Sequence, residues 1–185
     1  MVEGPVLPWV FTALFGALTI YSLLRVATDL SRPILAVGHL FHVAMSADMV
    51  AMSWPWWEAV PWRAELVVFV AATGWYVLLT ALAAARTRID LGPHPWWHQL
   101  MHAVMMAAMV WMVAAMPPGD HHHELSALAT GTGGALTAAL IGFGILTAAQ
   151  SVRGMRRREP RSIGLDHVAA TAMNFGMAGM CALML

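Results

Sequence analysis

Long hydrophobic runs, separated by short polar or proline-containing breaks, dominate the chain. A helix of about 20 residues crosses the roughly 30 Å hydrocarbon core of a bilayer. Six runs reach this length: residues 6–27, 34–53, 66–85, 97–116, 126–150 and 165–185. The pattern predicts an all-α integral membrane protein, a six-helix transmembrane bundle built from three helical hairpins. Because the runs take up most of the chain, we expect residues 1–185 to form a single transmembrane domain.

Composition supports this interpretation and excludes several classes of protein. The chain is 59% hydrophobic and only 11% charged, whereas an ordinary soluble domain is about 25% charged. It has no lysine and a formal net charge of zero, so we expect no nucleic-acid partner. With one cysteine it can form neither an internal disulfide nor a Cys-x-x-Cys site. Against this background, 15 methionines and 9 histidines stand out.

The arginines indicate how the bundle is oriented. Almost all of them fall near the breaks after the first, third and fifth runs: Arg25, Arg32, Arg86, Arg88, Arg153, Arg156, Arg157, Arg158 and Arg161. Only Arg63 lies in an alternate break. The positive-inside rule makes the arginine side cytoplasmic and places both termini outside. The outer breaks also hold the tryptophans expected at a membrane interface, Trp54, Trp56, Trp57 and Trp62.

A repeated methionine pattern marks the second, fourth and sixth runs. The second and fourth contain H-x2-M-x3-M-x2-M, and the sixth contains M-x3-M-x2-M. Positions i, i+4 and i+7 share one face of a helix, so each triplet forms a stripe. The stripes are Met45, Met49 and Met52; Met105, Met109 and Met112; and Met173, Met177 and Met180.

Histidines accompany each stripe at the predicted cytoplasmic end: His39, His42, His98, His102 and His167. A single methionine stripe is more often packing, because methionine is a flexible filler of apolar cores. Three copies of one spacing, each with histidine at the same end, favour ligand binding instead. Ionisable residues inside a membrane are costly and by default mark a functional site. Because such residues face the interior of a bundle, we expect the face with His98, His102, Met105, Met109 and Met112 to point into the protein.

The ligand types indicate which ion would bind. Thioethers select Cu(I), and imidazole suits copper, zinc, iron and nickel. If the three stripes converge, they form trigonal layers of Met45, Met105 and Met173; Met49, Met109 and Met177; and Met52, Met112 and Met180. A deeper layer would hold His42, His102 and either His39 or His167. The sequence therefore predicts a Cu(I) path through methionine layers to a histidine cluster.

Two acidic residues are weaker candidates. Asp48 lies within the second run, where an unpaired charge costs at least about 2.5 kcal/mol. It is either a counter-ion for a cation or a hydrogen-bonding partner of a neighbouring helix. Asp166 directly precedes His167 and is a helix cap, a first-turn acid or a metal ligand, and we expect capping.

A histidine triplet in an outer break is a further candidate metal site. It either captures a metal ion before entry or is a solvated polar turn. The triplet consists of His121, His122 and His123.

The H-x2-M-x3-M-x2-M pattern of the second and fourth runs resembles an uncharacterised family of small, His/Met-rich actinobacterial membrane proteins, a domain of unknown function. The resemblance extends over most of the chain. It implies a multi-pass protein of the bacterial plasma membrane with copper binding and no established activity. The methionine layers are also similar, by analogy only, to the selectivity sites of Ctr-type copper channels. Those channels assemble from three subunits, whereas one chain would supply all three helices here.

Three functional classes fit these residues, and the residues favour them in the following order. The first is a membrane copper protein that binds Cu(I) and passes it on, by transport or by delivery to a cuproenzyme. The second is a haem-b electron carrier with His or Met as axial ligands. The third is a membrane metalloenzyme, which leaves the methionine stripes without a role, so no catalytic residue is assigned. Besides the lipid bilayer, a copper chaperone or a cuproenzyme is the expected partner, and the sequence leaves oligomeric state open.

Overall fold

The computed structural model describes residues 6–85, 96–115, 126–157 and 160–185. In these ranges the protein is entirely helical, without a β-strand. The elements are α1 (Leu7–Thr28), α2 (Pro33–Met52), the short 3-10 helix η1 (Pro55–Ala59), α3 (Trp62–Ala84), α4 (Trp96–Ala115), α5 (Ala127–Arg157) and α6 (Arg161–Leu183).

The helix boundaries follow local sequence signals. Prolines stand at or next to the starts of α1, α2, η1, α3 and α6, where a missing backbone N–H and a fixed φ are tolerated. The predicted runs therefore end within a few residues of the helices. The largest differences concern α5, which continues to Arg157 instead of residue 150. Next come α3, which begins at Trp62 instead of residue 66, and α6, which begins at Arg161 instead of residue 165.

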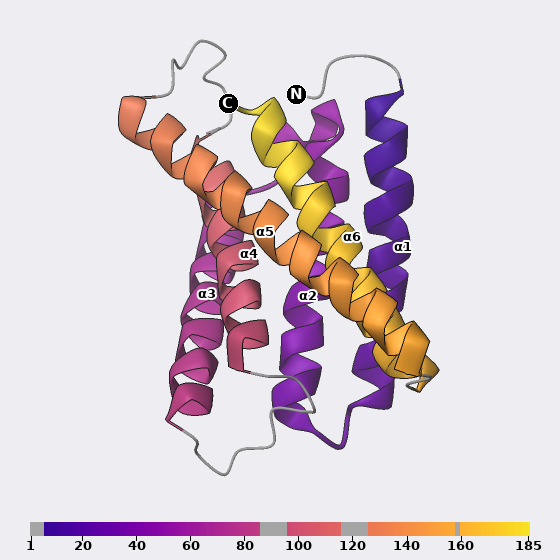
Figure 1. Ribbon diagram of the computed structural model, residues 1–185. Helices are drawn as coiled ribbons and strands as arrows, with labels where there is room; N and C mark the ends of the chain where they lie inside the picture. Colours follow the sequence, from indigo (N-terminus) through magenta and orange to yellow (C-terminus); the bar gives the residue numbers. More distant parts are fainter. Residues whose placement is uncertain (1–5, 86–95, 116–125, 158–159) are drawn as a thin grey trace.

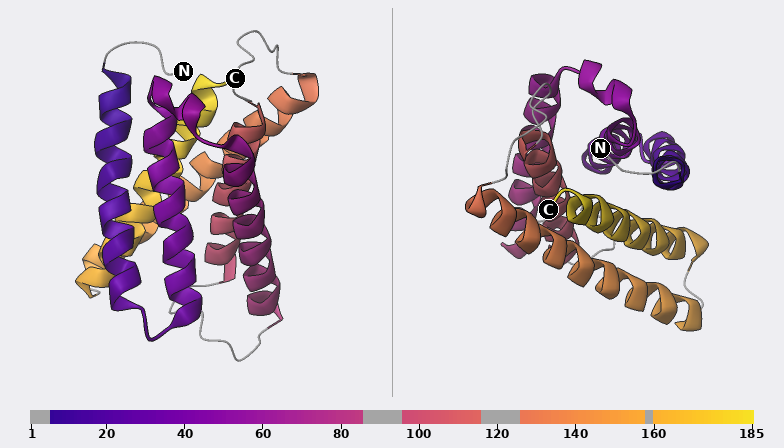
Figure 2. Two further views of the ribbon diagram at one scale, coloured as in Figure 1. Left: turned by 180° about the vertical axis from the view of Figure 1, so that it is seen from behind. Right: turned by 90° about the horizontal axis from the view of Figure 1, so that it is seen from above.

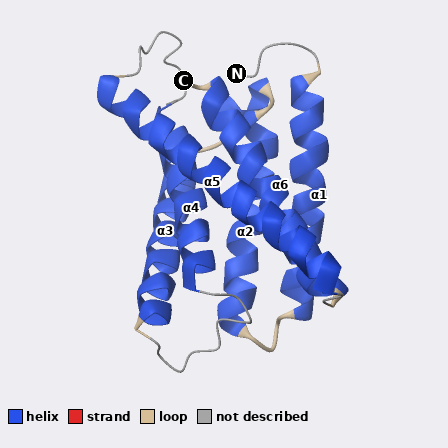
Figure 3. Cartoon of the chain, viewed as in Figure 1, coloured by secondary structure: helices blue, strands red, loops and turns tan. Residues whose placement is uncertain are grey.

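The helices form three antiparallel hairpins, as predicted. The most extensive contacts join α1 to α2, α3 to α4 and α5 to α6. Figure 1 shows the long α5 running obliquely across the other helices, and Figure 2 shows the three pairs grouped around a common centre. The start of α1 and the end of α6 lie at the same end of the bundle (Figures 1 and 3).

Five of the helices, α1 to α5, are long and apolar enough to cross a membrane. Many large hydrophobic side chains on their outer faces are exposed, as expected of surfaces that contact lipid tails. The helix α6 is long enough but is not among these five. It carries the polar residues Asp166, His167 and Asn174 along its length.

The helix α4 lies at the centre of the molecule. Of its most apolar stretch, 56% is buried inside the protein, against 22–28% for the other four candidate spans. It contacts α3, α5 and α6, and its methionines are fully buried. A helix that is buried on most of its circumference has little surface left for lipid. The core of the protein is therefore organised around the histidine- and methionine-bearing α4.

Candidate functional site

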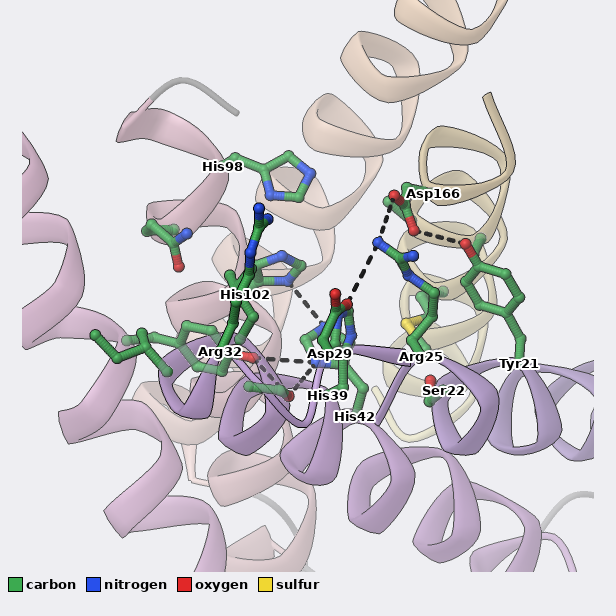
Figure 4. A pocket seen from close by; sticks show the side chains of 18 of the residues that line it. Tyr21, Ser22, Arg25, Asp29, Arg32, His39, His42, His98, His102 and Asp166 are labelled. Atoms are coloured by element: carbon green, nitrogen blue, oxygen red, sulfur yellow. Dashed lines mark hydrogen bonds and ion pairs between the residues drawn. The ribbon is translucent and has the colours of Figure 1, made fainter. Parts of the chain in front are cut away.

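A cavity of about 310 Å³ opens between α1, α2, α3, α4 and α6. Most of its lining comes from the end of α1, the beginning of α2, the beginning of α4 and the beginning of α6, so it lies at the arginine-bearing end of the bundle. Four of the five predicted histidines line it (Figure 4): His39, His42, His98 and His102. The structure therefore gathers these residues from two helices that are distant in sequence.

His42 of α2 and His102 of α4 are in direct contact in this cavity. The Nε2 atom of His42 lies 3.0 Å from Nδ1 of His102, and the two rings are nearly perpendicular. His98, one helical turn before His102, places its ring centroid 4.6 Å from that of His102. The three imidazoles therefore form a continuous group, defined here as the histidine cluster (His42, His98 and His102).

The other nitrogen of His42 is held by α2 itself and by α3. Its Nδ1 atom lies 2.8 Å from the carbonyl oxygen of Gly38 and 3.1 Å from the hydroxyl of Tyr76. The Tyr76 hydroxyl donates to the same Gly38 carbonyl over 2.9 Å. Both His42 and Tyr76 are buried, so these bonds are shielded from water.

An ion-pair network surrounds the mouth of the cavity. Arg25 of α1 lies 3.2 Å from Asp166 of α6 and 3.6 Å from Asp29, which in turn contacts Nε2 of His39 at 3.2 Å. Tyr21 donates its hydroxyl hydrogen to Asp166 over 2.6 Å. The acidic and basic groups compensate one another, and together they join α1, the α1–α2 turn, α2 and α6.

The expectation that Asp166 caps a helix was therefore wrong. Because α6 begins at Arg161, with Pro160 at its N-cap, Asp166 lies in the second turn and not at the start. Its carboxylate is used between helices, by Arg25 and Tyr21.

The three methionine stripes point into the protein. All nine of their side chains are buried, with at most 4% exposure. This confirms the predicted burial of the stripe of α4 (Met105, Met109 and Met112). Met173, the first methionine of α6, also lines the cavity. The cavity that holds the histidine cluster therefore reaches the methionine core at this residue.

Two further methionines of α4, Met101 and Met106, are fully buried as well. Met101 accepts a hydrogen bond from Asn174 of α6, over 3.2 Å between Nδ2 and Sδ. A thioether is a weak acceptor, and this contact joins α4 to α6 within the core. The stripe pattern had not singled out either methionine.

Asp48 lies apart from the histidine cluster, near the opposite end of α2. The buried Oδ2 atom of Asp48 has no hydrogen-bond partner among the described residues. Trp57 donates its Nε1 hydrogen to Glu65 over 3.2 Å. The role expected of Asp48, as a counter-ion or as a hydrogen-bonding partner of a neighbouring helix, stays a prediction.

His167 is buried in α6 but does not line the cavity. The triplet His121, His122 and His123 lies outside the described residues. Within the described ranges, no three His, Cys, Asp or Glu side chains are already arranged to hold a metal ion. A metal site in this cavity would need methionine sulfur, or a shift of the imidazoles, to complete it.

Sequence reasoning missed the polar partners of the histidines. The helix α3 was treated as a plain apolar span, yet Tyr76 from it reaches the His42 ring. Its buried residues Glu65, Phe69, Ala72, Tyr76 and Leu79 recur at helical spacing. This stripe, with a glutamate and a tyrosine in an otherwise apolar run, was the available signal.

Comparison with known proteins places the chain in one family. No curated protein and no solved structure matches it. A family model described as a domain of unknown function, DUF5134, matches residues 34–184, which include α2 to α6 and the whole histidine cluster. The chain therefore belongs to the DUF5134 family.

Proposed function

We propose that this protein spans a bacterial plasma membrane and binds Cu(I), which it passes between the histidine cluster and the methionine core. The observation that carries the proposal is that one cavity is lined by His42, His98, His102 and Met173. Imidazole and thioether groups thus meet in one space. Together they form a ligand set suited to a soft, monovalent copper ion.

The spacing of the histidines on α4 supports this function. His98 and His102 are four residues apart on one helix, the spacing by which two imidazoles on one helical face share a metal ion. Their rings are already neighbours, with centroids 4.6 Å apart. A thioether from the adjoining core would complete the coordination, since thioethers bind Cu(I) without losing a proton.

The methionine core supports passage of the ion. Nine methionines on three helices are buried in the region that leads from the cavity towards the end where α1 begins and α6 ends. Thioethers are soft and uncharged, and a series of moderate sites allows an ion to enter and also to leave. The receiving partner would be a copper chaperone or a cuproenzyme.

The orientation follows from the arginines. Arg25, Arg32 and Arg156 lie at the end of the bundle that contains the cavity mouth, and Arg63 lies at the other end. By the positive-inside rule the cavity would open to the cytoplasm, and both termini would face outside.

Haem b binding is the alternative function. The hydrogen bond between His42 and His102 leaves no room for a porphyrin between these two rings, so in this arrangement they could not hold one haem iron from opposite faces. His98 or a methionine would have to act as an axial ligand instead.

Metal analysis and a visible spectrum of the purified protein separate the two functions. We expect copper to co-purify, or to bind as Cu(I) under reducing conditions, without an intense Soret band. The His102→Ala variant should lose most of this copper, and the Gln99→Ala variant, in the same cavity, should keep it. A Soret band that disappears in His102→Ala would favour haem and contradict the proposal.

A further inference from the structure

The hydrogen bonds around His42 determine where the protons of two imidazoles lie. A neutral imidazole has one N–H donor and one acceptor nitrogen. The carbonyl oxygen of Gly38 can only accept, and it lies 2.8 Å from Nδ1 of His42. An unprotonated Nδ1 would bring two lone pairs together at this distance. The proton of neutral His42 must therefore be on Nδ1.

Tyr76 reinforces this assignment. Its hydroxyl hydrogen is directed to Gly38, so its oxygen can accept from Nδ1 of His42, which is 3.1 Å away. The N–H of His42 then has two oxygen acceptors, one from its own helix and one from α3. Both acceptors favour the same tautomer of His42.

The position of the proton on His42 determines the position of the proton on His102. With its proton on Nδ1, His42 offers only a lone pair at Nε2, which lies 3.0 Å from Nδ1 of His102. His102 must then carry its own proton on Nδ1. In neutral His102 the lone pair is then on Nε2, the atom through which this imidazole can bind a metal ion.

We infer that Tyr76 and Gly38 are positioning residues that fix the tautomers of His42 and His102, so that His102 receives a soft cation through Nε2. Binding of the cation in this inference rests on the proposed function, whereas the tautomers follow from the hydrogen bonds alone. A histidine ligand normally donates its second ring N–H to a fixed acceptor, which sets its tautomer and orientation. Here that acceptor is the His42 ring, which is held in turn by Gly38 and Tyr76.

This arrangement uses the absence of a side chain at Gly38. A Cβ atom at Gly38 would lie 3.2 Å from the Tyr76 hydroxyl oxygen, which is closer than ordinary van der Waals contact. Glycine in a helix interior lowers helix stability compared with alanine. At this position it permits the close approach of Tyr76 to the Gly38 carbonyl and to His42.

Nitrogen NMR of the ¹⁵N-histidine-labelled protein, without metal and at a pH where the imidazoles are neutral, tests the tautomers directly. Resonances are assigned with the His42→Ala and His102→Ala variants. We expect His42 and His102 both to carry the proton on Nδ1. A proton on Nε2 of His42 would overturn the inference, whether or not the protein binds copper.

The Tyr76→Phe variant tests the positioning role, because it removes only the hydroxyl group. We expect the His42 and His102 signals to shift or broaden, and Cu(I) affinity to fall about tenfold, as for other residues that orient a metal ligand. Tyr21→Phe is the matched control, since its hydroxyl lines the same cavity but bonds Asp166. It should leave both histidine signals unchanged.

Equal behaviour of Tyr76→Phe and Tyr21→Phe would overturn the positioning role. Gly38→Ala gives a second variant, and it should displace the Tyr76 hydroxyl and shift the same signals while the fold is kept. If the tautomers are as expected but wild-type protein binds no Cu(I), the proposed function fails and the hydrogen-bonded arrangement stands.

Discussion

At the scale of single residues, imidazoles and thioethers would contribute differently to ion binding. Imidazole must be unprotonated to coordinate a metal, whereas a thioether has no proton to lose. The histidine cluster lies in a cavity at one end of the bundle, and the methionines fill the adjoining core. Acid should therefore weaken the histidine site and leave the methionine sites unchanged.

Replacing His42 and His102 by alanine tests this difference between imidazoles and thioethers. We expect the tightest Cu(I) site to disappear together with the pH dependence of binding, while weaker, pH-independent binding remains. Acid weakens binding at the histidines because, as pH falls, protons compete with the metal ion for the same nitrogen atoms. Competitive titration with a Cu(I) indicator, across a range of pH, measures both properties. A double variant that keeps a pH-dependent tight site would place that site elsewhere.

At the scale of helices, the three methionine stripes are either the ion path or only packing. Replacing Met49, Met109 and Met177 by leucine removes one sulfur from each stripe and keeps volume and apolarity. Such exchanges usually cost less than about 1.5 kcal/mol each, so folding should survive. We expect loss of the weaker Cu(I) sites and slower passage of the ion into vesicles.

A double variant, Met106→Leu and Met155→Leu, is the control, since neither residue belongs to a stripe. If the stripe variant binds and moves Cu(I) as well as the wild type does, the methionines are packing. The histidines alone would then carry the function.

The packing of α4 against α5 depends on one glycine. A Cβ atom at Gly133 would overlap the indole ring of Trp111, which also donates a hydrogen bond to the Ala129 carbonyl over 2.9 Å. We expect Gly133→Ala to destabilise the protein by about 1–3 kcal/mol, as overpacking does. A thermal or denaturant unfolding transition in detergent measures the change.

Gly131, on the same helix, supplies the control, because a Cβ atom there meets nothing within 4 Å. Alanine has the higher helix propensity, so Gly131→Ala should be neutral or stabilising by up to about 1 kcal/mol. Equal effects of the two alanine substitutions would mean that α4 and α5 do not pack as described.

At the scale of the whole molecule, the sequence predicted the helices well and the site only in part. Apolar runs bounded by proline breaks located all six helices, because a membrane span needs both length and apolarity. The three hairpins followed from the methionine pattern, which recurs in every second run. The spacing of histidines and methionines on one helix face also predicted that Met105, Met109 and Met112 face inward, which their burial confirms.

The polar network could not be predicted, because it depends on contacts between residues that are distant in sequence. Tyr21 and Asp166 are 145 positions apart, and His42 and His102 are 60 apart. Spacing places each residue on a face of its own helix, but not against a particular residue of another. The role of Asp166 was misjudged for this reason. The start of α6 was misjudged for a local reason, because Pro160 places the N-cap before the apolar run begins.

Membrane orientation is open to a direct test with introduced cysteines. Glu58 in η1 and Arg156 in α5 are both exposed, and they lie at opposite ends of the bundle. In intact cells, a membrane-impermeant thiol reagent should label Glu58→Cys but not Arg156→Cys. The native Cys181 is fully buried, so the wild type should remain unlabelled. Labelling in the reverse pattern would invert the proposed topology.

Competition between ions on the purified protein tests the central claim most directly. Protein in detergent is titrated with Cu(I), or with Ag(I) as an air-stable substitute, in the presence of Zn(II). Thioethers favour the soft monovalent ions, whereas imidazoles alone would also accept zinc. We predict that Cu(I) and Ag(I) displace Zn(II) and that excess Zn(II) does not displace them. Equal or tighter binding of Zn(II) would contradict a path built from methionine and histidine, because the ion would then be using the histidines alone.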